Sequence, residues 1–179
     1  MAYEPERFDP LPLLERLADA DVDFVVIGGI AGGAHGSSYP TYDLDIAYAR
    51  DRDNLEKLVG VLRDIEAHLR GGPADLPFQL DAKTIEAGSH FTFATAYGSL
   101  DILSDPDGAP PYRKLKADAI KNDVRGRMIL FASLDHLIAM KDASGRTKDK
   151  LMATEYRVLS DELRAPSEDS GLDSSRRPA

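Results

Sequence analysis

The chain has 179 residues, of which 42% are hydrophobic, a length and composition typical of one globular domain with a substantial core. It contains no cysteine, which excludes disulfides, cysteine-based zinc sites and a thiol nucleophile. Its 31 acidic and 22 basic side chains give a formal net charge of −9, which argues against broad nonspecific adhesion to nucleic acid.

Membrane insertion and secretion are not expected. No apolar run approaches the roughly 20 residues that a membrane-spanning helix needs. The first residues, MAYEPERFDP, lack the basic and then apolar regions of a signal peptide, so we expect a cytoplasmic protein. We expect a single domain over residues 1–164. A disordered tail is expected over 165–179, because that segment is polar and rich in Pro, Ser and Asp.

Helix and strand patterns alternate in the first half of the chain. Asp9 can cap a helix that begins at Pro10, and VDFVVIGG is a buried-strand pattern stopped by glycines. In chain order the patterns predict a helix from Pro10, a strand over 22–29, a short helix over 30–35 closed by Gly36, a loop over 37–42, a strand over 43–49 and a helix over 51–70 ended by Gly71-Gly72-Pro73.

The second half continues with strands and then two helices. Residues 74–80 fit no single pattern. The later patterns predict a strand hairpin over 90–105 that turns near Tyr97-Gly98, a short helical or irregular segment over 110–120, a strand over 127–132, a helix over 134–144 capped by Ser133, and a last helix over 147–164.

Two carboxylates stand on one face of the strand predicted over 43–49. Residues two apart in a strand point to the same side, so Asp43 and Asp45 project together, with Leu44 and Ile46 on the opposite face. Two close carboxylates repel, and burying either costs several kcal/mol unless it is paired. A divalent cation offsets this cost, because hard oxygen ligands on one face suit Mg²⁺.

A third carboxylate and a glycine pair extend this pattern. Asp101 lies between Leu100 and Ile102, as a mid-strand carboxylate would. Gly28-Gly29 ends the first predicted strand and opens into a helix, where a phosphate can approach the backbone N–H groups closely. The sequence therefore predicts a phosphate-binding turn beside a metal-binding carboxylate set.

This arrangement resembles the nucleotidyltransferase (DNA polymerase β-like) superfamily. The resemblance is carried by Gly28-Gly29, a gap of thirteen residues, Asp43-Leu44-Asp45, and the later Asp101. The strings GGIAGGAHG and LIAMKDASGRTKDKL resemble the AbiEii-type toxins of bacterial toxin–antitoxin pairs more than polymerases. The resemblance covers residues 20 to 163. It implies an α/β (α+β) nucleotidyltransferase fold, in which a small mixed sheet is flanked by helices and followed by C-terminal helices.

The resemblance also implies a reaction and roles for particular residues. The reaction is Mg²⁺-dependent transfer of a nucleotide from a nucleoside triphosphate to the 3′ end of tRNA, with a cognate antitoxin protein as partner. The implied metal ligands and catalytic residues are Asp43, Asp45 and Asp101, with Lys141 and Asp149 also catalytic. The implied nucleotide-binding residues are Gly28, Gly29, Thr41, Lys141 and Arg146.

Two positions depart from the family pattern. Many members have an Arg where this chain has Tyr39, so no basic residue is carried over to that point. Gly29 replaces the Ser of many members. Any hydroxyl contact to phosphate must then come from Ser37, Ser38 or Thr41, or be absent.

Several alternatives stay open at the level of sequence. The acceptor could instead be a small molecule or a protein hydroxyl, or the chain could be a non-catalytic nucleotide-binding or partner-binding module. Six Lys and Arg lie within YRKLKADAIKNDVRGR, which is either a solvated face or a contact surface for an RNA backbone. His35 precedes Gly36 and fits a helix C-terminal cap better than a catalytic base.

Overall fold

A computed structural model describes residues 8–71 and 77–165. The tail predicted to be disordered over 165–179 lies outside the described residues except for Ala165. Within the described residues, the model has no helix of the length and apolarity that crossing a membrane requires.

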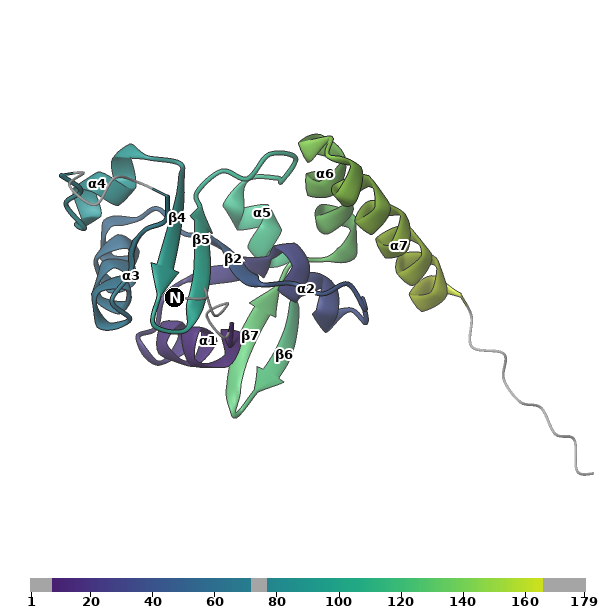
Figure 1. Ribbon diagram of the computed structural model, residues 1–179. Helices are drawn as coiled ribbons and strands as arrows, with labels where there is room; N and C mark the ends of the chain where they lie inside the picture. The colour runs from purple at the N-terminus through teal and green to yellow at the C-terminus, as the bar shows by residue number, and fades with distance from the viewer. Residues whose placement is uncertain (1–7, 72–76, 166–179) are drawn as a thin grey trace, which may run out of the picture.

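A mixed sheet forms the centre of the fold (Figure 1). Its strands are β1 (Phe24–Ile27), β2 (Asp43–Tyr48), β3 (His68–Leu69), β4 (His90–Thr95), β5 (Gly98–Leu103), β6 (Ile120–Val124) and β7 (Arg127–Phe131). They lie in the order β3-β4-β5-β2-β1-β7-β6. The pairs β2–β5 and β1–β7 are parallel and the other pairs are antiparallel. The predicted small mixed sheet flanked by helices is confirmed.

Seven helices surround this sheet in the part of the chain that is described. They are α1 (Pro10–Asp19), α2 (Gly28–Ala34), α3 (Arg52–Asp64), α4 (Ala82–Ala87), α5 (Tyr112–Ala117), α6 (Leu134–Ser144) and α7 (Thr147–Arg164). Helices α6 and α7 pack against each other at the opposite end of the molecule from α3 and α4 (Figure 1). As predicted, Asp9 and Ser133 cap α1 and α6, and His35 is the C-cap of α2.

The helix predicted over 51–70 ends earlier than the pattern indicated. Helix α3 stops at Asp64 because Glu66 takes a left-handed conformation with φ of 54°. The backbone N–H of Ala67 then donates to the carbonyl of Leu62, closing the helix end as a Schellman-type turn does. The chain continues into β3, so Leu69 is a strand residue. The prediction was wrong there because Ile65, Ala67 and Leu69 continue an apolar pattern into the strand.

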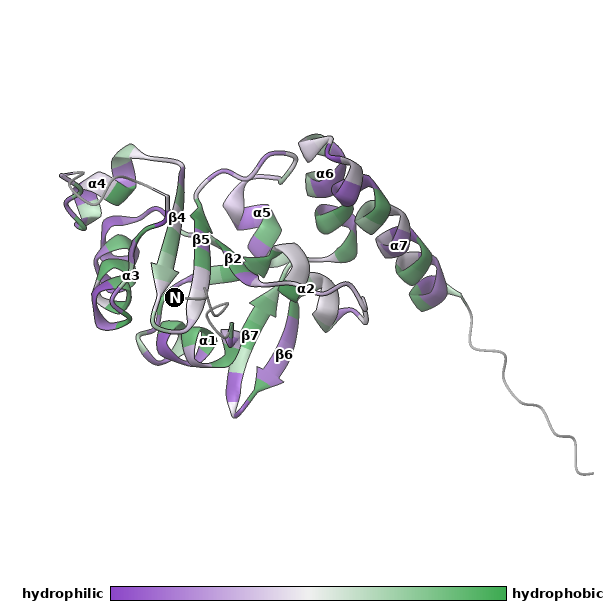
Figure 2. Ribbon diagram, viewed as in Figure 1, coloured by the Kyte–Doolittle hydropathy of each residue, from purple (hydrophilic) through white to green (hydrophobic). Residues whose placement is uncertain are grey.

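Strand β6 was not predicted, and its sequence explains why. IKNDV alternates between partly buried and exposed positions on the last strand of the sheet, where only one neighbour is paired. Figure 2 shows a mainly hydrophilic β6 beside a mainly hydrophobic β7. A short polar strand at an edge has little apolar signal, although such polarity protects an exposed edge from pairing with other chains.

Helix α2 packs closely against α7 at Gly32, which has no side chain. A Cβ added to Gly32 would lie 2.2 Å from the buried Tyr156 hydroxyl, whereas one added to Gly33 would meet nothing within 4 Å. The glycine at position 32 therefore lets α2 approach α7 closely. This contact brings the helix that follows β1 next to the C-terminal helices.

Alanine substitutions at these two glycines are expected to have opposite effects. Gly32→Ala should destabilise the protein by about 1–3 kcal/mol, because the methyl group overpacks against Tyr156. Gly33→Ala should stabilise it by about 0.5–1 kcal/mol, because alanine favours a helix and has free space here. Urea unfolding of both variants measures the difference. Equal destabilisation by both would contradict the close packing at position 32.

Candidate active site

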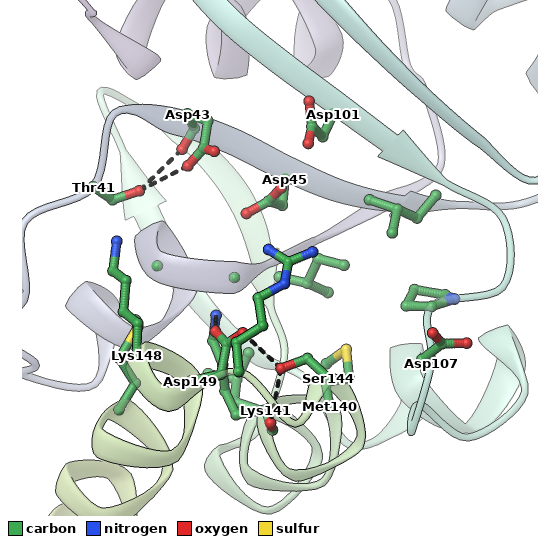
Figure 3. Close-up of a pocket in the computed structure, with 18 of the residues that line it drawn as sticks. Thr41, Asp43, Asp45, Asp101, Asp107, Met140, Lys141, Ser144, Lys148 and Asp149 are labelled. Carbon is green, nitrogen blue, oxygen red and sulfur yellow. Dashed lines mark hydrogen bonds and ion pairs between the residues drawn. The ribbon is translucent and has the colours of Figure 1, made fainter.

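Three carboxylates meet on one face of the sheet. Asp43 and Asp45 lie on β2, and Asp101 lies on the adjacent strand β5 directly opposite Asp45 in the register. One oxygen from each residue lies within 4.8 Å of the others. Figure 3 shows the three side chains together above the helices α6 and α7. The opposite face carries Leu44 and Ile46, both fully buried, as the alternation in the sequence predicted.

The carboxylates of this cluster repel each other. Burial, followed by the neighbouring charges of Asp43 and Asp101, raises the pKa of Asp45 to about 7. The Oδ1 atom of Asp101 is buried and accepts no hydrogen bond from any residue that the structure describes. A buried acceptor without a partner is costly. A bound cation would offset both of these costs.

The residues present fit a divalent metal ion. Three carboxylates supply several hard oxygen atoms within a short distance, which is the ligand chemistry of Mg²⁺ and similar ions. The Asp101 oxygen that lacks a hydrogen-bond donor could coordinate a bound cation, whose charge would also relieve the repulsion around Asp45. Asp43 is further held by Thr41, whose hydroxyl donates to its Oδ1 at 3.1 Å.

The glycine pair lies directly beside these carboxylates. Gly28 has φ of 66°, and a Cβ there would lie 2.0 Å from Oδ2 of Asp45. A Cβ on Gly29 would lie 2.8 Å from the hydroxyl of Thr41. Both positions therefore require glycine for close approach. The prediction placed the glycines at the end of the strand, and the structure begins helix α2 at Gly28.

Helices α6 and α7 bring cationic groups to the other side of the same pocket. The ammonium group of Lys141 donates to Asp149 Oδ1 at 2.8 Å, and the hydroxyl of Ser144 donates to its Oδ2 at 2.6 Å. Burial alone would raise the pKa of Asp149, but these hydrogen bonds and the charges of Lys141 and Arg146 together outweigh burial and lower it. The ionised Asp149 therefore fixes the position of Lys141. This contact is possible because α6 and α7 pack against each other.

A pocket of about 380 Å³ joins all of these groups. Every candidate site residue from the sequence lines it: Gly28, Gly29, Thr41, Asp43, Asp45, Asp101, Lys141, Arg146 and Asp149. Leu137, Met140 and Met152 add an apolar surface. Among the described residues no carboxylate lies within ion-pair distance of Arg146 or Lys148. Lys148 extends toward the segment of Thr41 and Asp43 (Figure 3).

Sequence reasoning missed four residues in or beside this pocket. Ser144 and Lys148 line the pocket and lie in the same segment, LIAMKDASGRTKDKL, as Lys141 and Asp149. His90 lies on β4 with its Nε2 atom 3.6 Å from Asp101, and Arg70 follows β3 at 3.8 Å from the same carboxylate. Strand pairing brings these two residues to Asp101. A correct strand prediction for His68–Leu69 could have found Arg70.

The basic run in YRKLKADAIKNDVRGR is largely neutralised by acidic neighbours. Lys114 pairs with Asp118, and Lys116 lies 2.7 Å from Asp23. Arg125 pairs with Glu15, and Arg127 pairs with Glu15 and Asp19. Arg113 and Lys121 remain exposed. The structure therefore favours the interpretation of this run as a solvated, ion-paired face.

Comparison with solved structures identifies the fold as that of nucleotidyltransferases. The lincosamide antibiotic adenylyltransferase LnuA matches 83% of this chain and 94% of its own, with a TM-score of 0.56 and 16% identity. A protein from Thermotoga maritima, described as a putative nucleotidyltransferase, matches 87% of this chain and 97% of its own (TM-score 0.52, 16% identity). An antigenic nucleotidyltransferase-like protein from Paracoccidioides brasiliensis matches 87% and 74% (TM-score 0.51, 16% identity). No protein-family model and no curated protein matches the sequence.

Proposed function

We propose that this protein is a metal-dependent nucleotidyltransferase that transfers a nucleotide from a nucleoside triphosphate to the 3′ end of tRNA. The observation that carries the proposal is the carboxylate set of Asp43, Asp45 and Asp101 beside a glycine turn, with Lys141 and other cations facing it across one pocket. The fold shared with nucleotidyltransferases supports the same reaction class.

The three carboxylates hold Mg²⁺ in this proposal. When bound there, Mg²⁺ would supply Lewis-acid chemistry, which would favour deprotonation of a hydroxyl and offset negative charge on pyrophosphate. Asp101 takes the proton of the acceptor hydroxyl, whose oxygen forms a bond to the α-phosphorus. The bond between the α-phosphorus and the bridging oxygen breaks, and pyrophosphate leaves. Asp43, oriented by Thr41, and Asp45 keep the reacting groups in line.

The triphosphate lies between the glycine turn and the C-terminal helices. Gly28 and Gly29 line the pocket at the start of α2, where backbone N–H groups can donate to phosphate oxygens. Lys141, positioned by Asp149, neutralises triphosphate charge, and Arg146 supplies a second cation. These groups favour the charge that develops on the leaving pyrophosphate, which is the main way in which proteins accelerate phosphoryl transfer.

The biological role proposed with this reaction is that of a toxin in a toxin–antitoxin pair. The support is the resemblance of GGIAGGAHG and LIAMKDASGRTKDKL to AbiEii-type toxins. In that role the protein modifies tRNA and stops growth until a cognate antitoxin protein binds it.

A small-molecule acceptor is the second candidate, and one observation favours it. Four of the six basic residues of the run over 112–127 are paired with carboxylates, so this face offers little free positive charge to an RNA backbone. LnuA, which shares the fold, is an adenylyltransferase of lincosamide antibiotics. Transfer to such a compound with no transfer to tRNA would support this candidate.

The test is incubation of the protein with total tRNA, Mg²⁺ and each α-labelled nucleoside triphosphate in turn. We expect label on tRNA with the wild type and no label with Asp43→Ala. Asp161→Ala, which changes an exposed carboxylate on α7, serves as the matched control and should retain full activity. Growth arrest by the wild type but not by Asp43→Ala in a bacterial host tests the toxin role. Transfer that persists in Asp43→Ala would overturn the proposed mechanism.

A further inference from the structure

A row of side chains crosses the sheet from the carboxylate cluster to the edge strand. Asp45 lies opposite Asp101, and Asp101 lies opposite Thr92 on β4. The backbone N–H of Arg70 donates to the carbonyl of Thr92 at 2.9 Å, which extends the row past β3. Thr92 and Ser99 are partly exposed on this face, and His90 is exposed. The row forms a polar shelf, defined by Arg70, His90, Thr92 and Ser99, next to Asp101.

Arg70 is oriented on this shelf, and among the described residues it makes no hydrogen bond to a carboxylate. Its Nη1 atom donates to the Ser99 hydroxyl at 2.7 Å, which orients the guanidinium group. Its Nη2 atom lies 3.8 Å from Asp101, too far for a hydrogen bond. By comparison, Arg127 makes hydrogen bonds of 2.7 and 2.8 Å to both oxygens of Asp19. The side chain of Arg70 is 45% exposed, so its remaining donors can reach a ligand.

The shelf lies on the opposite side of the carboxylates from the other cations of the pocket. Lys141 lies on α6, and Arg146 and Lys148 lie at the start of α7, a helix pair that meets the sheet through α2 beside β1 and β2. Arg70 and His90 lie beyond β5, on the β4 and β3 side. A triphosphate bound by Lys141 and Arg146 leaves the shelf to the second substrate.

The chemistry of the shelf selects the kind of acceptor. A guanidinium group recognises phosphate oxygens with several donors at once, and the imidazole and hydroxyl groups beside it can donate to the same anion. We propose that Arg70, supported by His90 and Ser99, binds a phosphate group of the acceptor adjacent to the hydroxyl that reacts at Asp101. This inference rests on the proposed nucleotidyl transfer and adds the acceptor site to it.

The experiment compares acceptors with and without that phosphate charge. The probe is a short RNA with a free 3′ end, and its partner carries a neutral methylphosphonate at the last internucleotide linkage. Arg70→Gln should lower kcat/KM for the normal RNA by roughly ten- to hundredfold while the KM for the nucleoside triphosphate stays unchanged. The methylphosphonate should lower kcat/KM of the wild type by a similar factor, with no further loss in Arg70→Gln. The matched control is Arg113→Gln, an exposed arginine on α5, which should stay within about twofold of the wild type.

Other outcomes separate this inference from the proposed function. Equal loss on both RNAs in Arg70→Gln, or a changed KM for the nucleoside triphosphate, would overturn the phosphate contact. Arg70-dependent transfer to glycerol 3-phosphate but not to RNA or glycerol would support the contact and identify the phosphate as that of a small molecule. If no acceptor is modified, fluorescence anisotropy can measure the binding of the same two RNAs to the wild type and to Arg70→Gln. Binding that depends on both Arg70 and the phosphate charge supports the inference, and binding that depends on neither overturns it.

Discussion

Asp45→Asn is expected to abolish nucleotide transfer and, at the same time, to make the metal-free protein harder to unfold at alkaline pH. The transfer rate should fall at least about a thousandfold, because the variant removes one of the three charges that we propose hold a metal ion. The same charge is unfavourable in the metal-free fold, since burial and the neighbouring carboxylates raise the pKa of Asp45 to about 7. The same substitution should therefore lower the transfer rate and raise the free energy of unfolding of the metal-free protein.

The pH dependence of this stability gain follows from the direction of the shift. Below about pH 4 Asp45 is protonated in both the folded and the unfolded state and costs nothing. Between about pH 4 and 7 only the folded protein keeps the proton, so its stability falls as the pH rises. Above about pH 7 the full cost applies, with an upper bound of about 4 kcal/mol.

The measurement is urea unfolding in the presence of EDTA across this pH range. The free energy of unfolding of Asp45→Asn should exceed that of the wild type by an amount that grows from about pH 4 to about pH 7 and then stays level. Mg²⁺ should stabilise the wild type more than the variant at about pH 8. A difference that does not change with pH would contradict the raised pKa.

Gly28→Ala is expected to have the next largest effect on transfer. The residue has φ of 66°, and an added methyl group would lie 2.0 Å from Oδ2 of Asp45. Either the carboxylate or the start of α2 must move, and a misplacement of about 1 Å in an active site can cost about a hundredfold in rate. We therefore expect a loss of about a hundredfold or more in kcat. The left-handed backbone adds a stability cost of about 1–2 kcal/mol.

Gly33→Ala is the matched control for this variant, since both residues lie on α2 and Gly33 has free space around it. It should retain the wild-type rate. Circular dichroism establishes whether Gly28→Ala is folded before its activity is measured. A folded Gly28→Ala protein with normal transfer would show that the position of Asp45 does not limit the reaction.

The carboxylate cluster could be predicted from the sequence because its geometry is local. The two-residue period of a strand places Asp43 and Asp45 on one face whatever the rest of the chain does. Asp101 needed one further assumption, that its strand lies next to theirs, and its flanking apolar residues made that assumption reasonable. The register then brings it opposite Asp45. The roles of Lys141 and Asp149 were instead implied by the family resemblance, and their pairing required the last two helices to pack together.

The shelf around Arg70 could not be predicted for the opposite reason. Its position depends on a two-residue strand that continues the apolar pattern of the preceding helix, and on a turn through Glu66 with φ of 54°. Neither feature has a local signature, since Glu is not a residue that favours a left-handed conformation. His90 reaches Asp101 only through the pairing of β4 with β5. Residues of this kind are placed by tertiary pairing alone.

The two sides of the pocket are attached to the protein by different kinds of bonds. Asp45 and Asp101 lie on paired strands, so the hydrogen-bond ladder of the sheet fixes their separation. Lys141 and Asp149 belong to a helix pair that leaves the sheet after Phe131 and is tied back by the hydrogen bonds of Ser37 and Ser38 to Glu155. A small rotation of that pair would change the distance between ammonium and carboxylates while every strand bond stays intact. The separation of the carboxylates is therefore set by the backbone of the sheet, whereas the distance across the pocket depends on side-chain packing and hydrogen bonds of the helices.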